Sequence, residues 1–245
     1  MYPIRSLMII SLFTFVLLSS CSSDEPVLVK KKTTLPHSQE NPELIEQKNE
    51  DEEVNEFIEF TLDDEVVMLN LNLVPILNQY LHAVSDRNKK IEEMNIQRIH
   101  QKVTNSIYLL EFSCHNSLCS YLLFDQNKDN TGHLVADLAN LIHAKLSPDH
   151  SKLLLQFNRE SNLPLPVTHL VVLNLEEWQP VKLENEHTDT QLLHYKWPIL
   201  GLDWVNNETI SVVIPDIIEP TPEMINNWQN ELEITTTILL KTQLE

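Results

Sequence analysis

The chain has 245 residues, and its 36 acidic and 17 basic side chains give a formal net charge of −19. This acidity argues against a nucleic-acid partner, because a phosphate backbone is bound by basic surfaces. The whole chain contains only two glycines, Gly132 and Gly201. Gly-rich phosphate loops, dinucleotide fingerprints and the G-x-S-x-G nucleophile elbow are therefore excluded, since each needs at least two glycines within one motif.

The first 20 residues have the pattern of a secretory signal peptide. Arg5 precedes an apolar run over residues 7–18, which is too short to span a membrane, because a span needs about 20 apolar residues. The run ends in Leu18-Ser19-Ser20-Cys21, which resembles the lipobox of bacterial lipoproteins. That resemblance implies cleavage before Cys21 and lipidation of Cys21 by acyl chains such as palmitate. An ordinary signal peptide with an incidental cysteine is the alternative.

Lipidated Cys21 would anchor the chain at the extracytoplasmic face of a cell membrane, since acyl chains contribute about 0.8 kcal/mol per buried CH₂ group. The residue after the cysteine is Ser22 rather than the Asp that retains such lipoproteins at an inner membrane, so the resemblance implies the outer membrane if the cell has one. Residues 21–53 are polar and show no period, which predicts a disordered tether. The globular domain is predicted over residues 54–245.

The domain begins with patterns typical of a hairpin and a helix. Two β-like runs flank Asp63-Asp64, which predicts a hairpin. Apolar residues then recur at helical spacing after Pro75, which suits a first helical turn. We expect one helix over about residues 75–94.

After Asn95 the pattern is typical of antiparallel strands joined by short polar connections. Pro222 opens one more short helix. The predicted fold class is mainly β: an antiparallel meander that forms either partial propeller-like blades or an open curled sheet or sandwich. The expected strands cover residues 96–103, 107–114, 119–125, 133–139, 141–147, 152–158, 168–175, 180–184, 198–204, 209–214 and 234–243.

Cys114 and Cys119 flank four residues between two apolar runs. In a hairpin that places Cys114 opposite Cys119, Phe112 lies opposite Tyr121, and a disulfide can form if the pair is of the closer, non-hydrogen-bonded type. The C-x-x-x-x-C spacing differs from the C-x-x-C of thioredoxin-like chemistry. We expect a structural disulfide, with a redox pair or a metal site including His115 as alternatives.

Asp125, Asn127 and Asp129 alternate like the first three oxygen ligands of a calcium loop. The loop would require Gly at its sixth position and Glu at its twelfth, where the chain has Asn130 and Ala136. The stretch is thus a weak calcium candidate, and a polar hairpin turn is the alternative. No other metal site and no cofactor is expected.

Two later stretches share an outline of strand, polar turn and strand. "LIHAKLSPDHSKLLLQF" (141–157) aligns with "PILGLDWVNNETISVVI" (198–214) when Leu146 is matched to Trp204, and residues 95–112 form a poorer third copy. The Ser-Pro-Asp turn is similar to that of TolB-type and WD-type propeller repeats. The resemblance implies four-stranded blades, although fewer than four repeats cannot close a ring.

No residue pattern selects a catalytic group. His143 and His169 lie on predicted strands, where packing is the simpler role, and the four tryptophans late in the chain serve either the core or a stacking platform for a sugar or peptide. We therefore expect a non-enzymatic, lipid-anchored, extracytoplasmic protein whose β-rich domain binds a protein or an envelope component. The alternative is an accessory solute-binding lipoprotein or a degenerate envelope enzyme.

Metabolic labelling with a fatty-acid probe should tag the wild-type protein and leave Cys21→Ser unlabelled, because the Cys21 thiol is the predicted acceptor of the lipid. In-gel fluorescence of the purified proteins measures the label. Equal labelling of the two forms would end the lipoprotein interpretation.

Overall fold

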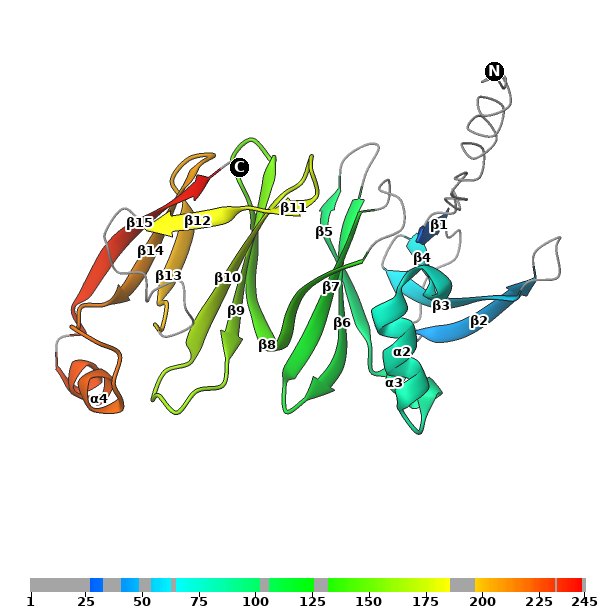
Figure 1. The fold of residues 1–245 in the computed structure, drawn as a ribbon, viewed down its shortest axis with the longest axis horizontal. Coiled ribbons are helices and arrows are strands. Elements are labelled where there is room, and N and C mark those ends of the chain that lie inside the picture. The colour runs from blue at the N-terminus through cyan, green and yellow to red at the C-terminus, as the bar shows by residue number, and fades with distance from the viewer. Residues whose placement is uncertain are drawn as a thin grey trace, which may run out of the picture.

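Antiparallel strands dominate the computed structural model, which describes residues 27–32, 41–48, 54–62, 65–101, 106–125, 132–185, 197–231 and 233–243. Within these ranges the strands form three sheets that lie in a row and do not close into a ring (Figure 1). The predicted mainly β fold with open, curled sheets is confirmed. Among the described helices, none has the length and apolar character needed to cross a membrane.

The first sheet contains β1 (Leu28–Lys32), β2 (Glu43–Lys48), β3 (Val54–Leu62) and β4 (Glu65–Asn70), in the order β1-β4-β3-β2. β3 and β4 form the predicted hairpin, in which Leu62 lies opposite Glu65. The expected turn at Asp63-Asp64 lies outside the described residues.

The tether predicted over residues 21–53 is wrong for two of its segments. β1 pairs along β4 and β2 pairs along β3, so both belong to the first sheet. Val27 and Leu28 are buried in the core, at 4% and 3% exposure. The polar composition of residues 21–53 gave no indication of these strands. A short apolar stretch within such a segment becomes buried only when a distant strand pairs with it. The first sheet thus includes residues that precede the domain start predicted at residue 54.

The helical region after β4 is divided where a single helix was predicted. A 3₁₀ turn, η1 (Leu71–Leu73), leads into α2 (Pro75–Ala83), and α3 (Arg87–Glu92) follows. α2 ends because Val84 adopts an extended backbone, and Asp86 caps α3 by accepting a hydrogen bond from the Lys89 amide. Asp86 therefore starts a second helix within the predicted range 75–94.

The second sheet is the predicted meander, because its spatial order follows the chain order. It comprises β5 (Asn95–Gln101), β6 (Ser106–His115), β7 (Leu118–Asp125), β8 (His133–Leu146), β9 (Lys152–Arg159), β10 (Val167–Asn174) and β11 (Gln179–Pro180).

β8 is one continuous strand where two strands, 133–139 and 141–147, were predicted. Its first part pairs with β7 and its second part pairs with β9. Pairing passes from β7 to β9 between Ala139 and Asn140, and the preceding Leu138 has a φ of 44°, a left-handed conformation that is strained for a leucine. The sequence alone suggested a turn near this point, but the chain bends without leaving the strand.

Three apolar cores lie between successive layers of the row. One face of β6 and β7 packs against the first sheet and the helices, through residues such as Tyr108 and Phe124. Their other face packs against β9 and β10, as Tyr121 does against Phe157. Because β8 is bent, the two halves of the second sheet face each other across the middle core.

The third sheet closes the row and contains β12 (Lys182–Asn185), β13 (Gly201–Trp204), β14 (Thr209–Pro215) and β15 (Thr235–Gln243), in the order β12-β15-β14-β13. Ile210 and Leu240 point into the third core. The outer face presents Thr235 and Thr237 to solvent. Leu239 continues this face at 36% exposure, so the outer face is only partly polar, as the last layer of a stack allows. The helix predicted after Pro222 is confirmed as α4 (Pro222–Asn230).

The two aligned stretches form neighbouring hairpins, β8–β9 and β13–β14. The Asp149 amide donates to Asn207 Oδ1 at 3.0 Å, and Lys145 Nζ lies 3.2 Å from Asp203 Oδ2. Each of these pairs joins positions matched by the 58-residue alignment. Hydrogen bonds from the Ser147 hydroxyl and the Ser151 amide to the Asp149 carboxylate lower its pKa to about 2.

A buried carboxylate joins the first sheet to the second. Glu65, at the start of β4, lies 2.6 Å from Lys30 Nζ of β1 and 3.0 Å from Arg98 Nη1 of β5. The Tyr108 hydroxyl donates to Glu65 at 2.7 Å. Burial lowers the pKa of Lys30, but its hydrogen bonds to Glu65 and Tyr108 outweigh this effect and the net pKa is raised. Glu65 thus holds four strands together.

Glu65→Gln should destabilise the domain, because Lys30 and Arg98 lose the charge that compensates their partial burial. Breaking a buried pair costs 3–5 kcal/mol, but both cations are partly exposed, so we expect about 2 kcal/mol. In a domain of this size that lowers the melting temperature by about 4–8 °C, measured by calorimetry. The exposed Glu177→Gln is the control, and equal effects of the two changes would contradict the role of Glu65.

Candidate functional site

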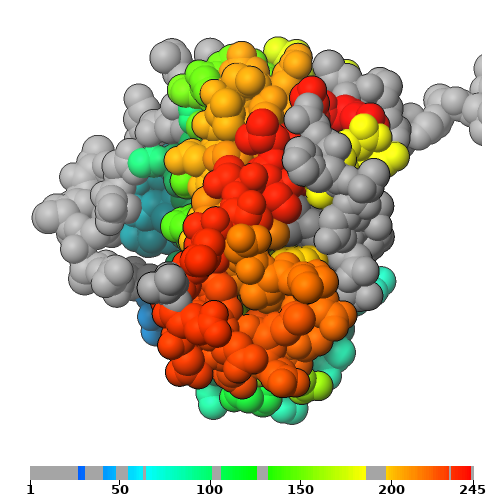
Figure 2. All heavy atoms as spheres, turned by 90° about the vertical axis from the view of Figure 1, so that its left-hand side faces the viewer, coloured from blue at the N-terminus to red at the C-terminus, as the bar shows by residue number. Residues whose placement is uncertain are grey.

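The loop and helix between β14 and β15 lie at the end of the row that the third sheet closes (Figures 1 and 2). α4 begins with an N-cap and a proline. The Thr221 side chain accepts a hydrogen bond from the Met224 amide at 3.2 Å, and Pro222 occupies the first turn. Ile225 is fully buried beneath the helix. Because the N-cap and the buried Ile225 fix α4, its remaining apolar side chains face the neighbouring loop.

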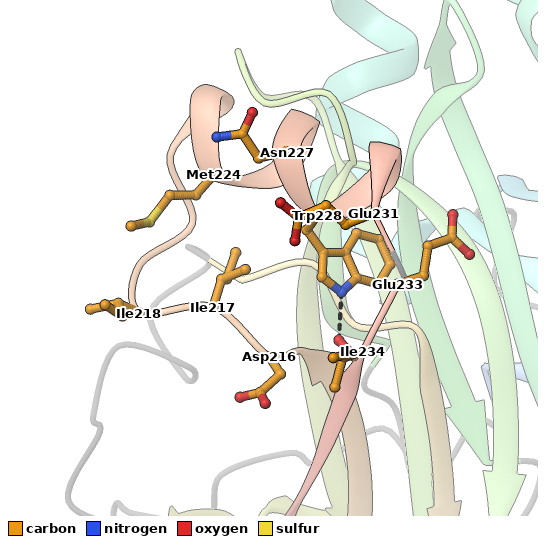
Figure 3. A pocket seen from close by; sticks show the side chains of 9 residues that line it. All are labelled: Asp216, Ile217, Ile218, Met224, Asn227, Trp228, Glu231, Glu233 and Ile234. Atoms are coloured by element: carbon orange, nitrogen blue, oxygen red, sulfur yellow. Dashed lines mark hydrogen bonds between the residues drawn. The ribbon is translucent and has the colours of Figure 1, made fainter.

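A pocket of about 250 Å³ lies between α4 and the strand ends, and we call it the α4 pocket (Figure 3). The Asp216 amide donates to the Ile234 carbonyl at 3.0 Å, so the end of β14 and the start of β15 are held side by side. The lining residues are Asp216, Ile217, Ile218, Met224, Asn227, Trp228, Glu231, Glu233 and Ile234.

The apolar part of the α4 pocket is open to solvent. Ile218 is 87% exposed and Ile234 is 56% exposed, while Trp228 is half-buried. The Trp228 indole is held in place because its Nε1 donates to the Ile234 carbonyl (Figure 3). An oriented aromatic ring beside exposed isoleucines is typical of an interaction surface, since such side chains gain free energy when a partner covers them.

Carboxylates surround this apolar surface. Asp216, Glu231 and Glu233 line the α4 pocket and are exposed. Residues 215–234 contain five acidic side chains and no Lys, Arg or His. The rim therefore carries charge of one sign, which favours a cationic ligand over an anionic one.

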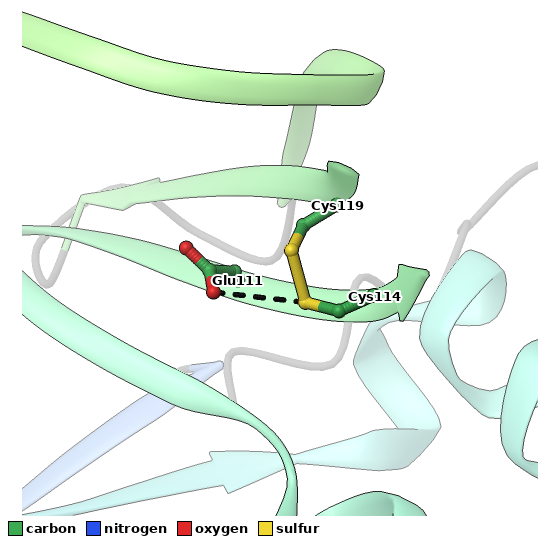
Figure 4. Close-up of side chains that lie close together, drawn as sticks. All are labelled: Glu111, Cys114 and Cys119. Carbon is green, nitrogen blue, oxygen red and sulfur yellow. Dashed lines mark hydrogen bonds between the residues drawn. A yellow bond between two sulfur atoms is a disulfide. The ribbon is translucent and has the colours of Figure 1, made fainter. Parts of the chain in front are cut away.

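The predicted cysteine pair lies at the tip of the β6–β7 hairpin. Cys114 and Cys119 form a disulfide with an S–S distance of 2.18 Å (Figure 4). The turn between them is tighter than expected, because Asn116 and Ser117 both have positive φ and form a two-residue connection.

The predicted register of this hairpin is wrong by one residue along most of its length. Phe112 lies opposite Ser120 rather than Tyr121, and a bulge with Ser113 at a φ of 53° then brings Cys114 toward Cys119. A bulge inserts an extra residue and turns the following side chains to the other face. Phe112 therefore packs in the first core, while Cys119 packs in the middle core.

Glu111 is the only acidic group close to the two sulfurs among the described residues. Its Oε1 lies 3.6 Å from Cys114 Sγ (Figure 4). A disulfide sulfur carries no proton to donate and is no thiolate ligand, so the oxidised pair suits neither a hydrogen bond nor a metal ion. Burial, with the nearby Glu111, raises the pKa of Tyr121 to about 12, so this tyrosine is neutral. The arrangement is that of a covalent staple beside a packed core.

The calcium candidate lies mostly outside the described residues. Asp125 ends β7 and is buried, whereas Asn127 and Asp129 lie in the undescribed segment 126–131. Cys21, the predicted lipidation site, is also outside the described residues. Both assignments stay predictions.

The histidines and tryptophans highlighted in the sequence do not form one site. His143 is exposed on β8, while burial and the charge of Arg159 lower the pKa of His169 on β10 to about 4. Trp178 and Trp197 are buried in separate cores. Trp228 is the tryptophan that lines the α4 pocket. The residues around Trp228 in this pocket were not predicted from the sequence, although the apolar pair Ile217-Ile218 between two acidic residues was a local signal.

Two further pockets lie elsewhere on the described surface. One of about 400 Å³ lies beside Thr61 and Asn95, and one of about 370 Å³ lies beside Asn116 and Arg159. Polar groups in the latter are already engaged: Arg159 pairs with Asp137 at 3.0 Å, and Asn158 accepts a hydrogen bond from Thr168. The pocket beside Arg159 is therefore less suited to a new ligand than the α4 pocket.

No protein-family model, curated protein or solved structure matches this chain. The resemblances to lipoproteins and to propeller repeats stay predictions.

Removing the disulfide should affect stability modestly and leave the α4 pocket intact. The closed loop is short, so the double substitution Cys114→Ser with Cys119→Ser should cost less than about 3 kcal/mol. Thiol titration of the unreduced wild type, denatured, should detect neither sulfur, and calorimetry of the double variant should still show a cooperative transition. Two titratable thiols from this pair in the wild type would contradict the structural role.

Proposed function

We propose that this protein is a lipid-anchored, extracytoplasmic interaction protein that binds another protein of the cell envelope through the α4 pocket. Membrane attachment would come from acyl chains on Cys21. The β layers would serve as a rigid support that presents the pocket at the far end of the row from β1.

One observation carries this proposal: the exposed apolar surface of Ile218 and Ile234 beside the oriented Trp228 ring. Large apolar side chains exposed together are costly unless a partner covers them. Aromatic anchors surrounded by polar groups are also typical of the centres of protein interfaces.

An accessory solute-binding lipoprotein or a degenerate enzyme is supported less well. Such a function requires polar groups that converge on an enclosed cavity. The polar side chains of the α4 pocket lie on its rim, and those of the Arg159 pocket are held by protein partners.

Site-specific photocrosslinking in intact cells tests the proposal. A photoreactive amino acid at Ile218 of the full-length protein should give a discrete crosslinked adduct, since this side chain is the most exposed part of the pocket. The same amino acid at Asn88, an exposed position on α3 at the other end of the row, is the control.

The adduct formed at position 218 should disappear when Trp228→Ala is added, because the ring that orients the contact is lost. Immunoblotting of cell lysates measures the yield, and calorimetry checks that Trp228→Ala still folds. Adducts of equal yield at positions 218 and 88, or none at 218, would refute docking at this site.

A further inference from the structure

We propose that the partner docks a basic amphipathic segment, with an apolar side chain in the α4 pocket and Lys or Arg side chains on its carboxylate rim. This inference rests on the proposed function and specifies the chemistry of the partner at that same site.

The size and lining of the pocket select a single apolar anchor. Its volume of about 250 Å³ lies below the roughly 300–1,000 Å³ of pockets for whole small molecules. Met224, Ile217 and Trp228 provide apolar walls, and Ile218 extends the apolar surface outward. One aliphatic or aromatic side chain fits this space while its backbone stays at the rim.

The charges around the pocket specify the flanking residues of that segment. Asp216 follows β14, Glu231 is the C-cap of α4 and Glu233 precedes β15, so carboxylates from three chain segments border the apolar centre (Figure 3). No cation in residues 215–234 neutralises them. Cationic side chains next to the anchor would pair with this rim, and one above the Trp228 ring would gain a cation–π contact.

The same charges disfavour two other occupants. An anionic membrane surface would be repelled by the rim, because like charges facing each other across an interface are unfavourable. A second copy of the chain would bring another formal charge of −19 against the first.

Binding of defined peptides to the full chain in a neutral detergent tests the inference. The probe is a labelled 14-residue peptide of leucine and lysine, with the leucines at helical spacing, and fluorescence anisotropy measures its binding. The control peptide has glutamate in place of every lysine. We expect the lysine peptide to bind and the glutamate peptide not to bind, after subtraction of a detergent blank.

Matched variants separate the rim from the general acidity of the chain. The triple substitution Asp216→Asn, Glu231→Gln and Glu233→Gln should weaken binding of the lysine peptide about tenfold, as exposed ion pairs each contribute modestly. The triple substitution Glu43→Gln, Glu177→Gln and Glu208→Gln removes the same charge from exposed sites elsewhere and should change binding less than twofold. Equal weakening by the two triples would overturn the inference.

Ile218→Ser tests the apolar surface that the partner's anchor would contact. It carries no risk of unfolding, because this side chain is 87% exposed. It should weaken binding of the lysine peptide several-fold, and unchanged binding would also overturn the inference. A crosslinked partner at position 218 together with a lysine peptide that does not bind would leave the proposed function standing and refute the basic segment.

Discussion

The fold depends on β8, which pairs with β7 along its first part and with β9 along its second part. Because one strand serves both halves of the second sheet, the halves must turn toward each other at Leu138. The bend creates the middle core and turns the opposite faces of β6–β7 and β9–β10 outward. Those faces are apolar and require cover, which the first and third sheets supply.

The function we propose follows from how this row of layers ends. A middle layer buries both faces, but the third sheet presents hydroxyl side chains such as Thr235 on its outer face. Ile218, beside α4, is the most exposed large apolar side chain of the described residues at 87%, whereas Leu200, Val205 and Leu239 elsewhere in this layer are 36–56% exposed. An apolar, acid-rimmed pocket on a rigid support suits recognition of a short segment, because the contact area is small and charge can contribute selectivity.

Local patterns predicted the elements well, whereas their pairing was harder to predict. The ends of most strands from β5 to β15 and the start of α4 fall close to their expected positions, because period-2 alternation and prolines act over a few residues. The register of the β6–β7 hairpin was wrong, because the bulge at Ser113 leaves no pattern in the sequence. The α4 pocket was also missed, since Asp216 and Ile234 become neighbours only when β14 pairs with β15.

The sequence by itself determined the mainly β class, the acidic surface, the cysteine pair and the positions of most turns, because these follow from composition and nearest neighbours. It also carries the predicted lipidation signal at Cys21. The tertiary structure decided that residues 27–32 and 43–48 are strands and that β8 is shared between two half-sheets. It also placed the apolar residues of the acidic segment between β14 and β15 around the α4 pocket. These outcomes depend on the free energy of contacts between distant segments, and a local sequence pattern gives no information about such contacts.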